Sequence, residues 1–488
     1  MIRTNALFRA WAAGSCLTLT LAAGCQSPRA IGFKTSPAEE AAAQKLADAA
    51  SKKAAEQPLE KAQGETDEAE NAIEQVAAEI PLHYDELSLP QLESLAMQHN
   101  PAIRQSTAAA TKAMGFRDQV GVAPNPTVGY NGSQLSDKST DQHTAYVEQD
   151  IVLGGKLQKN RIVLEQEVQA QLWEVQATRQ RVLTDVRTKF YESLAAQKRI
   201  ALSTEFGETT NKGIEAAKLR LQALEGTRTE LLQAEVQHTE VELFRQRGEF
   251  SLRAAWAELF AVVGCPTSGP TALVGNLKME LIARDWEQTY GVVVDASPEV
   301  HAACSRVARA TANLDRQQVQ PIPNLSVMVA AGRDNGTKSG MVNTQVGMPV
   351  PVFNRNEGNI NAAWAEYCRA TQEMQRIKLS IRARLARTAQ EYDSAALQVR
   401  TYEENIVPRA NEALKLAEQA YRAGEIDFFQ LLLVRRTYFD ANLTYITAQA
   451  DFASANAMID GLLLSGGLDE TPDTWADDGL RGQTLSGQ

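Results

Sequence analysis

Apolar residues in the second half of the chain recur at intervals of seven. One series is Leu385, Tyr392, Val399 and Ile406, and the other is Ile381, Thr388, Ala395 and Tyr402, in which Thr388 is the polar member. The matching part of the first half carries Val168, Val175 and Val182, followed by Val186, Phe190 and Leu194. A stripe this narrow, kept over many turns, is typical of the seam between long helices in a coiled coil.

The predicted helices are long and reverse at glycines. Residues 156–225 form an uninterrupted helical stretch, which at 1.5 Å per residue would reach about 105 Å. Gly226 and Gly424 follow the two longest stretches, and glycine is strongly preferred just beyond a helix C-terminus. We therefore expect each long helix to reverse there into an antiparallel partner. Pro408 is expected to kink or interrupt the helix of the second half.

Two pairs of strands precede these helices. In the second half, Leu325, Val327 and Val329 alternate along one strand, residues 342–350 alternate along the next, and residues 332–340 form the turn. In the first half the strands are expected at 127–135 and 143–153, with a polar turn at 136–141. Strands of about 9–11 residues are long enough to cross a bilayer when tilted.

The two halves follow one plan. Pro101, Pro124 and Pro126 recur as Pro298, Pro321 and Pro323, each 197 residues later. Each unit reads as one helix, two strands and two longer helices, and the first of these helices is expected to run unbroken over residues 89–121. We place the units at 88–270 and 290–466, joined by a connector at 271–289. A duplicated unit that cannot close alone usually completes a symmetric object.

Composition narrows the function classes. The chain has 488 residues, a formal net charge of -11 and only 17 prolines, a composition that favours long helices and argues against a nucleic-acid surface. Five cysteines without a CxxC pair and five histidines predict neither a disulfide framework nor a metal site. Gly154 and Gly155 lack the spacing of a phosphate-binding loop. No nucleophile and base pattern stands out, so we expect no enzyme activity and no cofactor.

The two ends of the chain carry a predicted targeting signal and low-complexity sequence. Residues 1–25 begin with Arg3 and Arg9, continue with a short apolar stretch and end in small residues before Cys25. This resembles a bacterial lipoprotein signal, in which Cys25 becomes the lipidated first residue; an ordinary cleaved signal with an incidental cysteine is the alternative. Gln26, rather than aspartate, implies the outer membrane. Residues 26–87 are predicted to be a low-complexity tether and residues 467–488 a disordered acidic tail.

From residue 88 to 465 the sequence resembles the outer-membrane efflux proteins of the TolC type. The resemblance rests on the duplication, the strand pairs, the helical hairpins and the strings at 149–156 and 349–358, which are similar to those of the cobalt-zinc-cadmium efflux branch. It implies a mainly α fold with a membrane β-barrel: a homotrimer whose chains each add four strands to a twelve-stranded barrel and their helices to a periplasmic tunnel. Four strands cannot close alone, and an open edge is not tolerated in lipid.

The resemblance also implies the function and the partners. The chain would be the passive exit duct of a tripartite efflux system, set in outer-membrane lipid, with a periplasmic adaptor and an inner-membrane resistance-nodulation-division pump, and its cargo would include heavy-metal cations. A duct for type I protein secretion and a lipid-anchored coiled-coil scaffold without a pore are the alternatives.

Residues at the helix reversals, which the family uses to hold the periplasmic mouth closed, are the candidate gate: Gly226, Arg228, Thr229, Glu230, Tyr421, Gly424, Glu425 and Asp427. Ordinary solvated turn residues are the competing interpretation.

A second set of candidate residues lies where the strands meet the long helices. These joint residues are Asp150, Gly154, Gly155, Lys156, Pro349, Pro351, Asn354 and Arg355, and we expect them to be mainly structural. Met328, Met341 and Met348 lie in or beside the strands, where packing or lipid contact explains them better than metal ligation.

Overall fold

The computed structural model describes residues 86–136, 139–265 and 269–469. The chain divides into two units, Met1–Ile80 and Pro81–Gln488, and all the described residues belong to the second. The predicted signal at 1–25 with Cys25, most of the predicted tether and residues 470–488 of the predicted tail lie outside the described residues.

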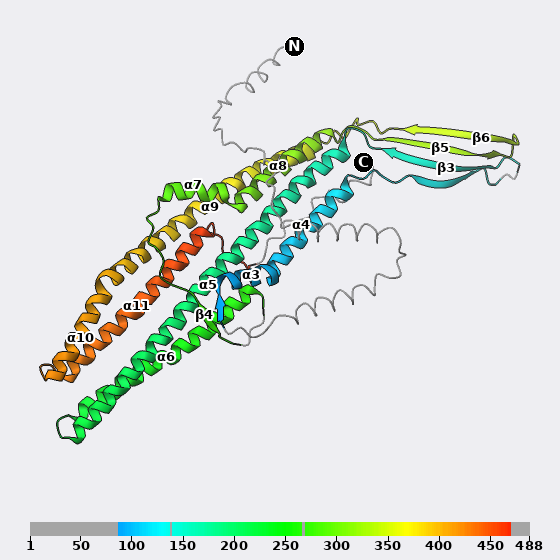
Figure 1. The fold of residues 1–488 in the computed structure, drawn as a ribbon. Coiled ribbons are helices and arrows are strands. Elements are labelled where there is room, and N and C mark those ends of the chain that lie inside the picture. Colours follow the sequence, from blue (N-terminus) through cyan, green and yellow to red (C-terminus); the bar gives the residue numbers. More distant parts are fainter. Residues whose placement is uncertain (1–85, 137–138, 266–268, 470–488) are drawn as a thin grey trace, which may run out of the picture. The chain divides into compact units, whose positions relative to one another are not determined.

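The element order is similar in the two halves (Figure 1). The first half contains β1 (Glu86–Ser88), α3 (Leu89–His99), α4 (Pro101–Val120), β2 (Thr127–Ser133), β3 (Gln142–Ile151), α5 (Lys156–Gln222) and α6 (Arg228–Val263). The second contains β4 (Ala272–Val274), α7 (Trp286–Ala296), α8 (Pro298–Val319), β5 (Leu325–Asp334), β6 (Ser339–Gly347), α9 (Glu357–Thr401), η2 (Tyr402–Ile406), α10 (Val407–Ala423) and α11 (Phe428–Asp460).

The first helix of each half is broken, so the expectation of an unbroken helix over 89–121 is wrong. Asn100 separates α3 from α4 with ψ 124°, and Ser297 separates α7 from α8 with ψ 119°. Each precedes a proline, whose ring disfavours the helical conformation in the residue before it. The proline then begins the next helix, where its missing N–H costs nothing.

Four strands form one antiparallel sheet in the order β2-β3-β5-β6. Val147 of β3 lies opposite Val128 of β2 and Val329 of β5, so the two hairpins are paired through their inner strands. The four strands were predicted, but β5 continues to Asp334 and β6 begins at Ser339, so the turn between them is shorter than expected.

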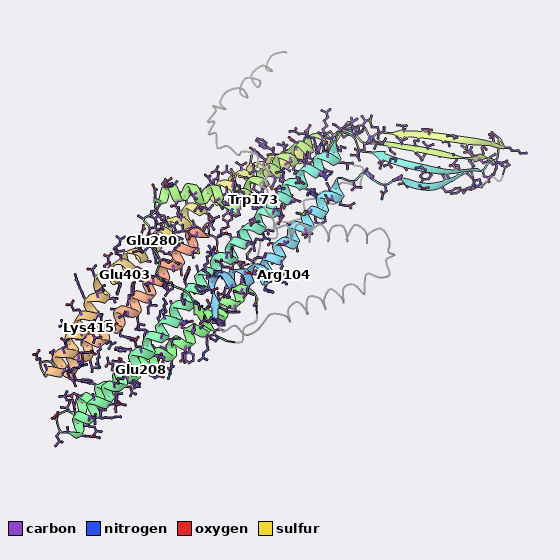
Figure 2. The ribbon with its side chains drawn as sticks, in the orientation of Figure 1. Arg104, Trp173, Glu208, Glu280, Glu403 and Lys415 are labelled. Carbon is purple, nitrogen blue, oxygen red and sulfur yellow. The ribbon has the colours of Figure 1, made fainter. Side chains whose placement is uncertain are left out.

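The helices follow the order of the strands. α4 packs against α5, α5 against α8, and α8 against α9 (Figure 1). Each of these helices is next in the chain to one strand of the sheet, α4 to β2, α5 to β3, α8 to β5 and α9 to β6, so the helices and strands have the same order. The reversals between α5 and α6 and between α10 and α11 are at the ends of the long helices remote from the strands. Figure 2 shows Glu208 on α5 and Lys415 on α10, in the arms leading to these reversals. Among the described helices, none has an apolar stretch long enough to cross a membrane.

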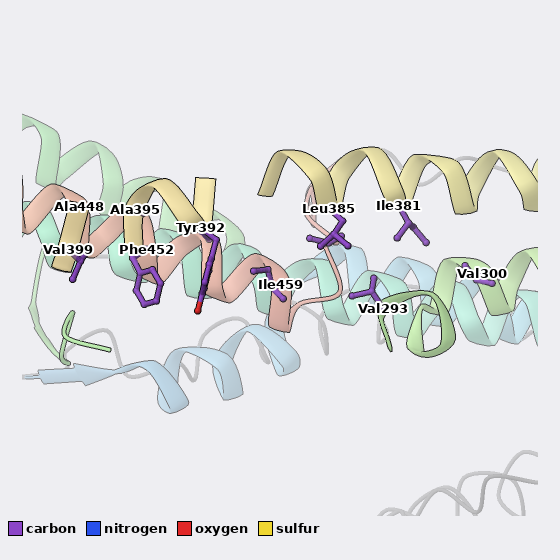
Figure 3. Close-up of a cluster of buried hydrophobic side chains, with 12 residues drawn as sticks. Val293, Val300, Ile381, Leu385, Tyr392, Ala395, Val399, Ala448, Phe452 and Ile459 are labelled. Carbon is purple, nitrogen blue, oxygen red and sulfur yellow. The ribbon is translucent and has the colours of Figure 1, made fainter. Parts of the chain in front are cut away.

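The predicted seam residues are buried. Ile381, Leu385 and Tyr392 of α9 pack in one cluster with Phe452 and Ile459 of α11 (Figure 3). The six predicted seam residues of α5, from Val168 to Leu194, are buried as well. Burial of such side chains contributes roughly 1.5–3 kcal/mol each, so this stripe holds the long helices together.

Tyr402 and Ile406, the last members of the two series, are only partly buried. Both lie in the π-helical segment η2, which changes the helical phase. Pro408 lies in the first turn of α10, directly after this segment, so the predicted interruption is confirmed.

Ion pairs join α5 to α8 at successive positions along the two helices, and one joins α8 to α9. Glu174 pairs with Arg306 at 2.5 Å, and Glu167 pairs with Arg309 at 3.1 Å. Further along, Glu299 of α8 accepts hydrogen bonds from Arg181 of α5 at 2.9 Å and from Arg384 of α9 at 2.6 Å. Burial raises the pKa of Glu299, but its two arginines outweigh burial and hold the pKa below the ordinary value.

Short segments attach the ends of the described chain to the helices. Glu86 and Leu87, placed in the tether by the sequence, belong to β1, which pairs in parallel with β4 in the predicted connector. At the other end, the amides of Gly466 and Gly467 donate to the Asp185 carboxylate at 3.0 and 2.6 Å. Part of the predicted tether and the start of the predicted tail are therefore ordered.

Candidate functional site

The reversal between α10 and α11 is built around Gly424. Gly424 has φ 77°, the left-handed conformation that glycine adopts at no steric cost. The amide of Gly424 donates to Tyr421 O at 3.1 Å, and that of Glu425 donates to Ala420 O at 2.9 Å, which satisfies the last carbonyls of the helix. Asp427 then caps α11 by accepting from the Gln430 amide at 2.7 Å. The predicted glycine at this reversal is confirmed.

The reversal between α5 and α6 has the same geometry, but its left-handed residue is Leu224, with φ 62°. Leu224 donates to Leu221 O at 3.2 Å, Glu225 donates to Arg220 O at 2.9 Å, and Thr227 caps α6 by accepting from the Glu230 amide at 3.2 Å. The helix therefore ends before the position predicted for the reversal.

Gly226 lies in the predicted reversal, but the left-handed residue that ends the helix is Leu224. Leu224 and Thr227 correspond to Gly424 and Asp427, 200 positions later, so Gly226 corresponds to Ile426. A Cβ at Gly226 would lie 3.0 Å from Arg220 Cβ and 3.3 Å from its carbonyl carbon. Gly226 thus permits a close approach of the backbone, rather than a left-handed turn.

A hydrogen bond joins the two reversals. Arg220, in the last turn of α5, donates through Nη1 to the Tyr421 hydroxyl at 2.7 Å, and its guanidinium carbon lies 5.5 Å from the centre of the Tyr421 ring. Nη2 of Arg220 donates to Glu225 O at 3.4 Å. The bond to Tyr421 raises the pKa of the Arg220 guanidinium, so this side chain stays charged. Sequence reasoning found Tyr421 but missed Arg220, although a cation in the last helical turn is a common C-terminal signal.

Apolar contacts lie beside this bond. Ile214, Ala217, Ala234 and Phe428 form a buried cluster that Tyr421 covers. Further from the reversals, the rings of Phe206 on α5 and Phe439 on α11 stack with their centres 4.6 Å apart. The two hairpins therefore touch at an aromatic contact and again at their ends.

The remaining predicted gate residues lie in the exposed turns. Arg228, Thr229 and Glu230 form the first turn of α6, and Glu425 follows Gly424. Within the described part of the chain, no side-chain hydrogen bond or ion pair joins Arg228, Thr229 or Glu425 to another residue. The structure brings together Tyr421 and Arg220 but not these three.

An apolar groove of ≈ 390 Å³ runs between α6 and α11 near the reversals. Leu232 and Val236 line it from α6, and Phe429 and Leu433 line it from α11. All four side chains are exposed, and Arg436 and Glu240 close the groove with their charged groups 3.8 Å apart.

The joint between strands and helices is braced by side chains. Gly154 and Gly155 are both left-handed, with φ 70° and 64°, and Gly155 is the N-cap of α5. Lys156 is 8% exposed and donates to Asn324 Oδ1 at 3.1 Å, and burial lowers the pKa of its ammonium group. This bond ties the start of α5 to the segment before β5.

The second half has an equivalent brace. Asn356, the N-cap of α9, is left-handed with φ 62°. Its amide donates to Asn354 Oδ1 at 3.0 Å, and its side chain donates to Gln317 O at 2.8 Å. Sequence reasoning missed Asn324, Gln317 and Asn356, which make the contacts.

The other predicted joint residues are exposed: Asp150, Pro349, Pro351 and Arg355. Among the residues that the structure describes, no group of three or more His, Cys, Asp and Glu side chains is placed to hold a metal ion.

Comparison with known proteins agrees with this architecture. The sequence profile of the family described as "Outer membrane efflux protein" matches residues 92–264 and again 290–463. The chain belongs to this family. The expected outer-membrane efflux channel, an exit duct that extends into the periplasm, is thereby confirmed.

This outer membrane efflux protein has a curated relative and several structural neighbours. It is 26% identical over 383 residues to the cobalt-zinc-cadmium resistance protein CzcC of Cupriavidus metallidurans, covering 77% of this chain and 90% of that protein. The CusC structure superposes with TM-score 0.63 at 16% identity, covering 78% of this chain and 92% of that one. The outer membrane protein VceC of Vibrio cholerae gives TM-score 0.61 at 18% identity, covering 77% and 96%. These structural likenesses concern the fold.

Proposed function

We propose that three copies of this chain form one duct, with a twelve-stranded barrel in the outer membrane and an α-helical tunnel in the periplasm. Each half of the chain, 88–270 and 290–466, would supply two strands and one long helical hairpin. The hairpin ends form the periplasmic mouth, and the contact between Arg220 and Tyr421 holds it closed.

The sheet supports the trimer. In the described chain, β2 and β6 each pair on one side only, so the sheet has two open edges. Unpaired backbone groups are costly in hydrocarbon, and closing the sheet with further copies removes both edges. Three copies of a four-stranded sheet give a barrel wide enough to enclose water.

The single observation that carries the closed mouth is the hydrogen bond from Arg220 to Tyr421. It connects the end of α5 to the end of α10, so the two hairpins cannot separate there without breaking it. A hydrogen bond to a charged group contributes about 1.5–3 kcal/mol.

Conductance in planar bilayers tests the gate. Tyr421→Phe removes only the hydroxyl and keeps the ring over its apolar cluster. Loss of about 1.5 kcal/mol would raise the ratio of open to closed channels about tenfold. The matched control is Tyr438→Phe on α11, whose hydroxyl has no hydrogen-bond partner among the described residues, and its conductance should equal that of the wild type.

Two results would count against the proposal. Equal conductance of Tyr421→Phe and Tyr438→Phe would remove the gate but leave the duct. Absence of any wild-type conductance, from protein that is correctly folded by circular dichroism, would remove the duct and favour the scaffold without a pore.

The cargo and partners complete the proposal. The relative CzcC is named for cobalt, zinc and cadmium resistance, and we extend this cargo class, heavy-metal cations, to the present chain. A resistance-nodulation-division pump would supply the energy, and a periplasmic adaptor would dock its helices at the mouth. The apolar groove between α6 and α11 supports such docking, because an amphipathic helix buries its apolar face in a groove of this kind. Acylated Cys25 would add a lipid anchor.

A further inference from the structure

The four-stranded sheet has one largely apolar face. Because residues paired across an antiparallel sheet point to the same side, the pairing register assigns each side chain to a face. One face carries large apolar or aromatic side chains that are each at least 43% exposed: Val128, Tyr130, Val147, Ile151, Val329, Val342 and Val346. Such side chains, exposed on every strand, suit contact with lipid if the sheet belongs to the proposed barrel.

This apolar face ends at a row of basic residues. His143 of β3 and Arg333 of β5 are paired in register, at the end of the sheet opposite to Ile151, where β3 leads into α5. The distance from Ile151 to His143 is about 27 Å along the strand, or about 20 Å across a membrane for a strand tilted by about 40°. Since the apolar band of a membrane barrel is about 25 Å tall, this row lies near the edge of the band, at the level of the lipid headgroups. In the proposed duct, with its helices in the periplasm, these are the headgroups of the outer leaflet.

The acidic groups at this end of the sheet are engaged by the protein itself. The Asp334 carboxylate accepts hydrogen bonds from two amides of the following turn at 2.8 and 3.3 Å. The Asp141 carboxylate accepts a hydrogen bond from Asn335 Nδ2 at 3.0 Å and lies 2.8 Å from His143 Nε2. The other ring nitrogen of His143 is hydrogen-bonded to the Tyr130 hydroxyl. Neither carboxylate is therefore left to neutralise a further cation.

Two basic side chains beside these groups have no such partner. Arg333 is exposed, and Lys338 is exposed in the turn between β5 and β6. Within the described residues, no side-chain hydrogen bond or ion pair joins Arg333 or Lys338 to another residue. Gly340 is paired with Arg333, so β6 presents no side chain opposite the guanidinium. Unpaired cations at the edge of a lipid-facing surface attract negatively charged headgroups.

We infer that Arg333 and Lys338 bind the phosphate of an anionic lipid in the outer leaflet, with one lipid on each copy of the chain. The inference rests on the proposed duct, because it needs the four strands to lie in the membrane. A guanidinium matches a phosphate and donates two parallel hydrogen bonds to it, whereas the Lys338 ammonium adds a point charge. The acyl chains of the lipid would lie along the apolar face. The exposed Tyr130 ring lies near the same level, where aromatic residues gather in membrane barrels.

Native mass spectrometry of the full chain in a neutral detergent tests this inference, because it reports both the number of chains and each bound lipid. Phosphatidylglycerol is titrated, with zwitterionic phosphatidylcholine as the comparison. The wild-type trimer should bind its first three phosphatidylglycerol molecules more tightly than further ones, and more tightly than phosphatidylcholine. Arg333→Gln and Lys338→Gln should each weaken these first steps about fivefold, the effect of one basic residue near an anionic lipid.

Three controls define the site. Lys212→Gln removes an exposed charge on α5, away from the sheet, and should leave the affinity for phosphatidylglycerol unchanged. Arg333→Lys keeps the charge but loses the two parallel hydrogen bonds, so it should weaken binding less than Arg333→Gln. Inorganic phosphate at matched ionic strength should not displace the lipid, because it makes no contact with the apolar face. Circular dichroism in the same detergent checks that each variant is folded.

The outcomes for the duct and for the lipid site are distinct. A trimer that binds both lipids equally, or an Arg333→Gln trimer with the wild-type affinity, overturns the lipid site and leaves the duct standing. Displacement of the lipid by inorganic phosphate also overturns the lipid site, since it identifies free phosphate as the ligand. A wild-type chain that is folded but monomeric overturns the duct and the lipid site together.

Discussion

Leu224 holds a backbone conformation that its own side chain disfavours. Its φ of 62° is left-handed, and its side chain is 93% exposed, so no burial offsets the strain. For residues with a Cβ this conformation costs roughly 1–2 kcal/mol. Gly424, at the same place in the other reversal, avoids the cost.

Exchange of residue types at these two positions should have opposite effects. Leu224→Gly should stabilise the first hairpin by about 1 kcal/mol, and Gly424→Ala should destabilise the second by a similar amount. Thermal melting followed by circular dichroism at fixed protein concentration measures both. Leu224→Ala is the control, because it shortens the side chain but keeps the Cβ; if it matched Leu224→Gly, strain would not be the cause.

Single residues were predictable where their local preference is strong. Both reversals were found because glycine is the usual residue beyond a helix end, but in the first reversal Leu224, two residues before Gly226, takes the left-handed conformation. Arg220 escaped prediction because its partner, Tyr421, is 201 positions away. A contact over that distance depends on how two hairpins pack, which the local pattern of neither one records.

Elements were predictable from periodicity and less so from their breaks. The seven-residue spacing identified the buried stripe of α5 and α9, and the alternation identified four strands. The breaks at Asn100 and Ser297 were missed because the apolar pattern continues past each proline, although proline is tolerated at the start of a helix and not in its interior. What decides is the residue before the proline, which has to leave the helical conformation.

Asn100 tests how much this break matters. Its side-chain oxygen caps α4 by accepting from the Ala102 amide at 2.8 Å, and its Nδ2 donates to Val262 O of α6 at 2.6 Å. Asn100→Ala should lower stability by about 1–3 kcal/mol, since it removes a cap and leaves a buried carbonyl without its donor. Asn100→Asp keeps the capping oxygen but loses the donor to Val262 O, so it should cost less than Asn100→Ala only if capping dominates. Thermal melting of the three proteins decides between the two contributions.

The arrangement of the whole described unit depends on charges that the sequence pattern did not reveal. The heptads predicted an apolar seam, but not the ion pairs that cross α5, α8 and α9. Glu299 illustrates the reason, because Arg181 and Arg384 reach it from helices far away in sequence. The order of α4, α5, α8 and α9, by contrast, follows from the order of the strands in the sheet, because each of these helices is adjacent in sequence to one strand.

Acid should weaken this assembly through Glu299. Its pKa is lower in the folded state than the ordinary value of 4.5, so its stabilising contribution is present at neutral pH and is lost as pH falls through the folded pKa. The melting temperature should therefore drop below pH 4.5. Glu299→Gln should destabilise the protein by about 1–2 kcal/mol at pH 7, a modest value because the arginines are partly exposed, and should flatten the acid dependence.

A matched substitution checks that prediction. Glu366 pairs with Arg369 within α9, at the helix surface, and such pairs contribute at most a few tenths of a kcal/mol. Glu366→Gln should leave the melting temperature nearly unchanged at pH 7. If it lowered the melting temperature as much as Glu299→Gln, general loss of negative charge would explain both.

The stacked rings of Phe206 and Phe439 have a mechanical consequence for the ends of the hairpins. From Phe206 to Leu224 the arm of α5 extends by about 27 Å at 1.5 Å per residue, so a swing of about 5° at the rings displaces the end by about 2 Å. The bond from Arg220 to Tyr421 is 2.7 Å long and cannot follow such a displacement. A small rotation of one hairpin about the aromatic contact would therefore break this hydrogen bond and open the proposed mouth.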